Sequence, residues 1–207
     1  IKNNKLHVVN ELLSKEPNID LKNEKGESPI HLALENGARS KFVLLLMNNP
    51  DLDILDNDGN TPLIKAIELE DIESAKELIV KGAKILCLTE DIGTCTEMRL
   101  AREKKLFEIS ELIEEIEAIK MTGITPAKAH SIIKDQKYTL LEYLFVNESL
   151  KTKSNGFNLI SNAIEIDNSA ARVRFVQLML ANGMGPNGEP NDKGYPLIAA
   201  IKKNDIT

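Results

Sequence analysis

Short apolar segments with helical spacing recur along the chain and alternate with polar, turn-rich stretches. Their apolar residues stand three and four positions apart, which places them on one face of a helix. The segments are residues 41–47, 73–80, 106–113, 140–145 and 174–180. The pattern predicts an all-α fold built from a series of short helices.

A second phrase recurs ahead of these helices at a nearly constant interval. Gly26 precedes S-P-I-H-L-A at residues 28–33, and 33 residues later Gly59 precedes T-P-L-I-K-A at residues 61–66. Ser or Thr followed by Pro predicts a helix start, because the hydroxyl can cap free backbone N–H groups and Pro fits the first helical position. Gly three residues before the Pro suits a turn with positive φ. Variants of the phrase start at residues 96, 125, 158 and 195.

The stretches between helix pairs carry turn signals. Residues 51–59, D-L-D-I-L-D-N-D-G, are extended and end in an Asn-Asp-Gly tip that suits a hairpin-like turn. Gly82 and Gly183 each follow a predicted helix, where Gly favours a helix C-terminus. Each repeat is therefore predicted to read as turn, helix, turn, helix.

This period of about 33 residues, with a T-P-L-H-x-A phrase in the first helix, resembles the ankyrin repeat family. The resemblance is strongest over residues 5–88 and 154–201. It implies an ankyrin-repeat solenoid of stacked helix–turn–helix units with hairpin-like loops, irregular in the middle. We expect N-terminal repeats in residues 1–120 and divergent C-terminal repeats in residues 121–207. Residues 5–14 resemble a second helix without its first and residues 195–205 a first helix without its second, so we expect the native protein either to continue beyond this sequence or to end in caps.

Two regions depart from the repeat pattern. Residues 111–120 place Ile and Leu on one helical face and Glu on the other, which indicates either a solvated outer face or an acidic docking surface for a basic partner. Residues 181–194 contain extra Gly and Pro, as in a lengthened hairpin loop, which can be a binding loop or a tolerated insertion.

Composition and charge exclude several function classes. The net charge of -6 and the pI of about 5.3 argue against nucleic-acid binding and against adhesion to anionic membranes. No apolar run approaches the roughly 20 residues of a membrane-spanning helix. The two cysteines, Cys87 and Cys95, are expected to be reduced thiols in an intracellular protein. The three histidines show no metal-ligand spacing with either cysteine, so no zinc site and no cofactor is predicted.

No catalytic motif is found, and the chain is predicted not to be an enzyme. Residues 56–60 resemble the start of a calcium loop, but its twelfth position is Ile67 where Glu is needed. His31 lies in the signature helix, where the family's His usually braces the neighbouring loop, so it is assigned a structural role.

The resemblance implies that a partner protein binds at the hairpin tips and at the free face of the first helices. The tip residues are Glu24, Lys25, Glu27, Asn57, Asp58, Asn60, Ser154, Asn155, Phe157, Asp192 and Lys193. The first-helix residues are Glu35, Asn36, Glu68, Leu69, Glu165 and Ile166. Phe157 is either a binding anchor, a role that aromatic residues favour, or it folds back onto a neighbouring hairpin.

The sequence thus predicts a monomeric protein–protein interaction module, without nucleic acid or membrane insertion among its partners. The alternative is the targeting segment of a larger enzyme whose catalytic domain lies outside these 207 residues. A composition rich in Ile, Lys and Asn is associated with AT-rich genomes, and ankyrin arrays of this kind resemble secreted effectors of intracellular bacteria. We therefore weigh an intracellular, cytoplasmic location against secretion into a host cell.

Overall fold

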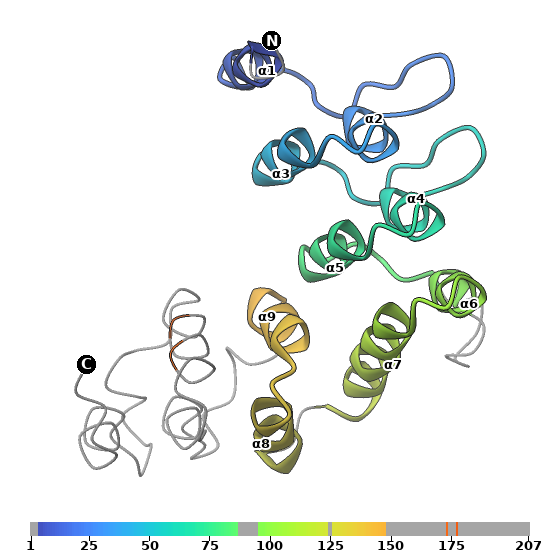
Figure 1. Cartoon of the computed structure of the whole chain (residues 1–207), viewed down its shortest axis with the longest axis vertical. Helices are drawn as coiled ribbons and strands as arrows, with labels where there is room; N and C mark the ends of the chain where they lie inside the picture. The colour runs from blue at the N-terminus through green and yellow to red at the C-terminus, as the bar shows by residue number, and fades with distance from the viewer. Residues whose placement is uncertain (1–3, 87–94, 124–125, 148–172, 174–176, 178–207) are drawn as a thin grey trace. The chain divides into compact units, whose positions relative to one another are not determined.

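The computed structural model describes residues 4–86, 95–123 and 126–147, together with Val173 and Gln177 (Figure 1). Within these ranges the regular elements are helices, and no strand is found. The chain divides into two compact units, residues 1–114 and residues 115–207. The all-α prediction is confirmed.

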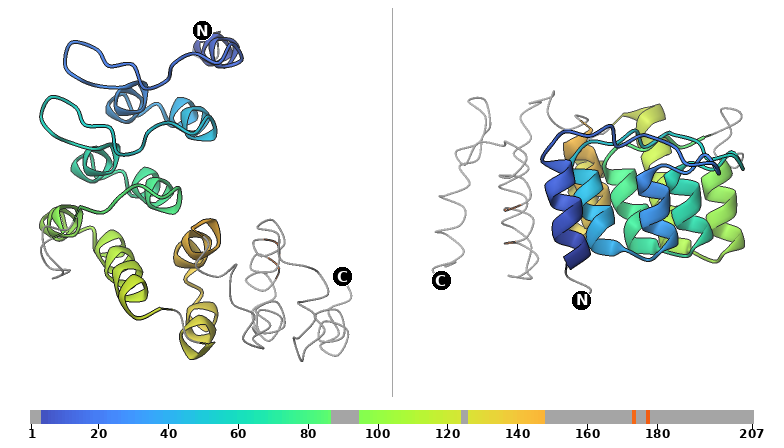
Figure 2. Two further views of the ribbon diagram at one scale, coloured as in Figure 1. Left: turned by 180° about the vertical axis from the view of Figure 1, so that it is seen from behind. Right: turned by 90° about the horizontal axis from the view of Figure 1, so that it is seen from above.

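Helices of the first unit form two parallel rows (Figures 1 and 2). Contacts join α2 to α4 and α4 to α6 within one row, and α2 to α3 and α4 to α5 between the rows. The first row consists of α2 (Pro29–Glu35), α4 (Pro62–Glu68) and α6 (Thr96–Glu103), and the second of α1 (Asn4–Leu13), α3 (Arg39–Met47) and α5 (Ile72–Val80). The repeated helix–turn–helix unit predicted from the sequence is therefore present.

Aliphatic side chains fill the space between the rows. Ile30, Leu63 and Ile67 of the first row and Leu78 of the second are almost completely buried. Ala66, in the middle of α4, has no exposed surface, and its small side chain lets the neighbouring helices approach closely. Burial of this apolar surface is the main stabilising contribution to such a stack.

The helix starts predicted from Ser or Thr followed by Pro are confirmed where the structure describes them: α2, α4 and α8 (Pro126–Lys134) begin at Pro29, Pro62 and Pro126. Ser28 and Thr61 are the N-caps of α2 and α4, each followed by Pro. In the phrase that lacks Pro, Thr96 is the first residue of α6, and Cys95 is the N-cap. Glu97 occupies the place of the Pro, and its Oε2 accepts a hydrogen bond of 2.9 Å from the Leu86 N–H. Without Pro the phrase no longer determines where the helix begins.

The turn between the two helices of each described repeat has a left-handed residue. Gly37 occupies it in the first described repeat, at φ 56°. The later repeats place Glu70, Lys105 and Gln136 there, at φ between 54° and 58°. Non-Gly residues are strained in this region, so these turns depend on the packing of the helices that they join.

Helix α7 (Phe107–Thr122) is a single uninterrupted helix of 16 residues. It passes through the predicted boundary after Lys120, and the division between the two units falls inside it, after Glu114. The assignment of repeats to residues 1–120 and 121–207 remains a prediction. In the second unit, α8 (Pro126–Lys134) packs against α9 (Tyr138–Val146).

Two further sequence expectations meet the structure here. Cys95 is disulfide-bonded, so the expectation of a reduced thiol is wrong for this residue. The number of cysteines in a sequence indicates whether a protein comes from a compartment in which disulfides are common, but it does not show whether one particular cysteine forms a bond. Cys87 lies outside the described residues. Among the helices that the structure describes, none is long and apolar enough to cross a membrane.

Candidate functional site

The two described hairpin loops are built in the same way, 33 residues apart. In tip 1 (residues 23–27) the Asn23 Oδ1 accepts hydrogen bonds from the N–H groups of Lys25 and Glu27, at 3.0 and 2.9 Å. In tip 2 (residues 56–60) the Asp56 Oδ1 accepts from the N–H groups of Asp58 and Asn60, at 3.0 and 2.8 Å. One Asn or Asp side chain therefore shapes each tip, as expected for these residues in turns.

The two tips are joined to one another through Asn57. Its N–H donates to the Lys25 carbonyl at 3.0 Å, and its Nδ2 donates to the Glu24 carbonyl at 3.0 Å. Gly26, at φ 74°, lies directly against this residue. A Cβ on Gly26 would stand 2.7 Å from the Asn57 nitrogen, closer than real Cβ contacts. Gly26 is thus required both by its backbone conformation and by the close approach of tip 2.

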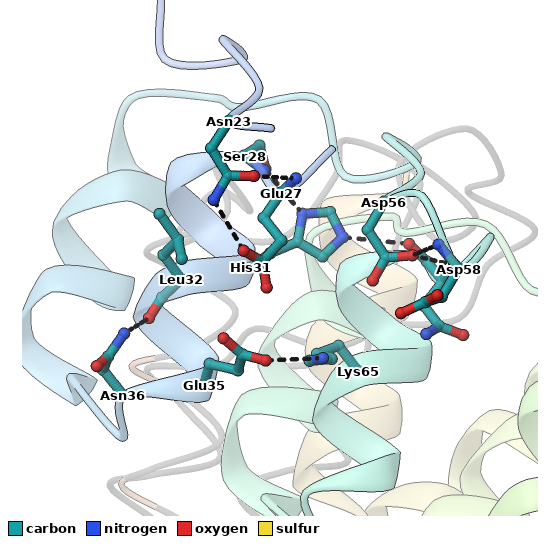
Figure 3. A network of polar contacts seen from close by, with 11 residues as sticks. Asn23, Glu27, Ser28, His31, Leu32, Glu35, Asn36, Asp56, Asp58 and Lys65 are labelled. Carbon is teal, nitrogen blue, oxygen red and sulfur yellow. Dashed lines mark hydrogen bonds and ion pairs between the residues drawn. The ribbon is translucent and has the colours of Figure 1, made fainter. Parts of the chain in front are cut away.

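His31 forms a second link between the first repeat and tip 2 (Figure 3). Its Nδ1 lies 3.3 Å from the Ser28 nitrogen and 2.9 Å from Ser28 Oγ, and its Nε2 lies 3.2 Å from the Asn60 carbonyl oxygen. The Ser28 amide can only donate, so Nδ1 accepts and the proton is on Nε2, which donates to Asn60. Burial lowers the pKa of His31 below 6.5, which favours this neutral form.

Ser28 and His31 have the atom types of a nucleophile and a base, but their setting excludes catalysis by this pair. Both side chains are 0% exposed, so no substrate can reach the hydroxyl. Their contacts complete the start of α2 and position tip 2. The structural role predicted for His31 agrees with this geometry.

The exposed face of the first helices contains a charge pair between repeats. Lys65 Nζ lies 3.1 Å from Glu35 Oε1, joining α4 to α2 (Figure 3). Lys65 lowers the pKa of the Glu35 carboxyl, and Glu35 raises the pKa of the Lys65 ammonium group. Glu68 is exposed beside this pair, and Leu69, at the end of α4, is 44% exposed.

The predicted binding residues therefore differ in how free their side chains are. Glu24, Lys25 and Asp58 are exposed, and among the described residues their side chains form no hydrogen bond or ion pair. Glu27 was predicted at the surface, but it is only 5% exposed, and its carboxylate accepts a hydrogen bond from Asn23 Nδ2 at 2.8 Å. Asn57 is exposed, yet its amide is engaged with tip 1.

The remaining predicted residues fall into two groups. Asn60 is half-buried and contributes backbone groups to tip 2, and Asn36 is exposed with its Nδ2 donating to the Leu32 carbonyl at 2.7 Å. The others lie outside the described residues: Ser154, Asn155, Phe157, Glu165, Ile166, Asp192 and Lys193.

The acidic face of α7 is largely neutralised within each unit. In the first unit Glu108 pairs with Lys76 at 2.6 Å and Glu114 with Arg102 at 3.3 Å. In the second unit the negative charges have lysine partners as well: Glu115 pairs with Lys128 and Lys137, and Glu117 with Lys120. This pairing favours the solvated outer face over an acidic docking surface.

Sequence reasoning did not single out the exposed apolar side chains of Leu32 and Phe107 or the contact between Glu35 and Lys65. Leu32, on the same face as Glu35, is 36% exposed, and Phe107, at the start of α7, is 63% exposed. Phe107 could have been noticed as an aromatic residue in the first turn of a predicted helix. The contact between Glu35 and Lys65 was not predictable from spacing, because the two residues belong to different repeats.

No metal or cofactor site emerges from the part of the chain that the structure describes. No group of three or more His, Cys, Asp or Glu side chains in it is positioned to hold a metal ion. What the site offers is an exposed surface of two fixed tips beside the charged face of the first helices. Such a surface suits recognition of another molecule.

Comparisons with known proteins agree with the repeat pattern. Residues 1–88 match the family model described as ankyrin repeats, in three copies. Over 68 residues the chain is 29% identical to the B-cell lymphoma 3 protein homolog of Mus musculus. The matched stretch makes up 32% of this chain and 15% of that protein, so the chain spans only a small part of this relative.

Proposed function

We propose that the chain, whose residues 1–88 match the ankyrin-repeat family model, binds a partner protein through tip 1, tip 2 and the adjoining face of its first helices. Ankyrin repeats are in general protein–protein interaction modules, and the mechanism is recognition without turnover. The partner is a folded protein or an extended peptide lying along the exposed surface.

The arrangement of the tips carries this proposal. Hydrogen bonds within and between the tips use backbone groups and the side chains of Asn23, Asp56 and Asn57. The side chains of Lys25 and Asp58 are left exposed on a backbone that is already ordered. A preorganised surface loses little conformational entropy when it binds, which favours affinity.

The face of α2 and α4 adds apolar contact to this charged surface. Leu32 and Leu69 are 36% and 44% exposed, on the helices that follow the tips. Apolar side chains beside polar ones are typical of binding surfaces, in which a few anchors supply most of the binding energy.

The proposal is tested by protein capture with three immobilised forms of the chain. The first is the parent chain, and the second carries Glu24→Ala, Lys25→Ala and Asp58→Ala. The third is a charge-matched control that removes two exposed acids and one exposed base elsewhere: Lys81→Ala, Glu111→Ala and Glu142→Ala. Each is exposed to the same cell lysate, and retained proteins are identified by mass spectrometry.

Binding through the tips predicts a protein that the parent and the control retain and that the tip variant loses. Circular dichroism of all three forms checks that the tip variant is folded. The same proteins retained by all three forms, or none by any, would refute binding through these residues.

A further inference from the structure

We propose that protonation of His31 separates tip 1 from tip 2, so that pH controls the geometry of this surface. The hydrogen bonds that connect the first repeat to tip 2, from His31 to Asn60 and from Asn57 to tip 1, are called the joint below. The consequence for binding rests on the proposed function. The opening itself is a property of the free protein and is tested without a partner.

Both ring nitrogens of His31 are in use when the joint is closed. Nδ1 accepts from the Ser28 amide, and Nε2 donates to the Asn60 carbonyl of tip 2. A proton on Nδ1 converts it into a donor that points at the donating Ser28 amide. Ser28 Oγ, at 2.9 Å, can accept from the new N–H, but the buried amide then loses its partner. An unsatisfied buried donor is costly, which disfavours the closed joint.

The charged groups around His31 only partly compensate. The carboxylates of Asp56, in tip 2, and Glu27, in tip 1, favour the imidazolium, whereas Lys65 on α4 disfavours it. Desolvation is the largest effect and lowers the pKa of His31 below 6.5. The imidazolium is therefore favoured by states in which the ring reaches water.

The direction of the pH effect follows from this order. The closed joint binds fewer protons than the open one, so its stability is complete above pH 6.5. That stability declines as the pH falls below 6.5 and continues to decline down to the lower pKa of the closed state. Because one proton is involved, the open fraction rises by at most tenfold per pH unit in this window.

The second repeat offers a natural non-titrating substitute for His31. Ile64 occupies the equivalent position of α4, where its N–H donates to Thr61 Oγ1 at 3.2 Å. The variant His31→Ile therefore places at this position a residue that the same kind of helix already accommodates. It retains the neighbouring carboxylates, so any pH response due to them remains.

Amide hydrogen exchange of the free protein is measured at several pH values between 5 and 7.5 and corrected for intrinsic exchange. The reporter is the Asn57 N–H, which joins tip 2 to the Lys25 carbonyl. We expect its protection in the parent chain to fall below pH 6.5, by up to tenfold per pH unit, and to show a smaller pH response in His31→Ile. Equal pH responses in the two proteins, or constant protection in the parent, would overturn the proposal. If His31→Ile is unfolded by circular dichroism, the His31→Gln variant supplies the non-titrating comparison.

Discussion

Alanine substitutions at Gly26 and Gly59 separate the effect of backbone conformation from the effect of contact between tips. The two glycines occupy equivalent positions in tip 1 and tip 2, with φ values of 74° and 82°. A Cβ on Gly59 would meet no atom of the described residues within 4 Å, whereas a Cβ on Gly26 would meet Asn57 at 2.4 Å from Oδ1 and 2.7 Å from the nitrogen. The pair is therefore matched in strain and differs in packing.

The expected losses of stability follow from these contacts. At either position alanine in the left-handed region costs about 1 kcal/mol. At Gly26 the tips must also separate, which breaks the two hydrogen bonds that Asn57 donates to tip 1. Each contributes about 1 kcal/mol, giving about 3 kcal/mol for Gly26→Ala against about 1 kcal/mol for Gly59→Ala. Loss of chain entropy in the unfolded state is similar for both and cancels in the comparison.

Urea unfolding followed by circular dichroism at 222 nm measures the difference at pH 7.5. Repeat arrays can unfold in stages, so the midpoint and slope of the earliest transition are compared rather than a single global value. Amide exchange at Asn57 gives a local check, because its N–H reports the contact between the tips. Equal losses for the two variants, or a greater loss for Gly59→Ala, would show that the approach of Asn57 to Gly26 contributes nothing.

Three further variants test other features of the fold. Thr61→Ala removes the hydroxyl that accepts the Ile64 N–H at the start of α4 and should cost about 1 kcal/mol in urea unfolding. Glu35→Gln should lower the free energy of unfolding by at most about 1 kcal/mol at neutral pH and low salt, because its partner Lys65 is only partly buried. The pKa of Glu35 is lowered in the folded state, so this difference in free energy between variant and parent should shrink as the pH falls through that pKa. High salt should shrink it as well. Lys105→Gly should raise stability by roughly 0.5 kcal/mol, because relief of left-handed strain at φ 58° exceeds the entropy cost of Gly, and a lower thermal midpoint would contradict this.

The fold was predictable where each local signal acts over a few residues. Ser28-Pro29 and Thr61-Pro62 predicted the starts of α2 and α4, because capping and the fixed φ of Pro are local effects. The family resemblance is confirmed over residues 1–88. Where Glu97 replaces the Pro, this signal is missing, and the N-cap of α6 is Cys95.

The candidate site was predictable only in part, because its contacts join residues from different repeats. Glu27 lies in a polar stretch that predicts an exposed side chain, but it is buried and its carboxylate accepts a hydrogen bond from Asn23. Asn57 reads as a free tip residue, but its amide is directed to the Glu24 carbonyl, 33 positions earlier. Spacing within one repeat contains no information on such contacts, and they emerge only when the repeats are stacked.

Within each tip, some side chains hold the backbone and others are exposed, which leads to a last prediction about the positions at which binding specificity can change. Asp56 is buried and its Oδ1 accepts two backbone N–H groups, so Asp56→Ala leaves two donors without a partner and should cost about 2–3 kcal/mol. Asp58, two positions later, is exposed, and Asp58→Ala should change the free energy of unfolding by less than about 0.5 kcal/mol. Urea unfolding of the two variants measures both values under the same conditions. If Asp58→Ala proves as destabilising as Asp56→Ala, the tip side chains are part of the fold rather than free to meet a partner. If only Asp56→Ala is destabilising, residues such as Asp58 can vary without loss of the fold, as a surface that determines specificity requires.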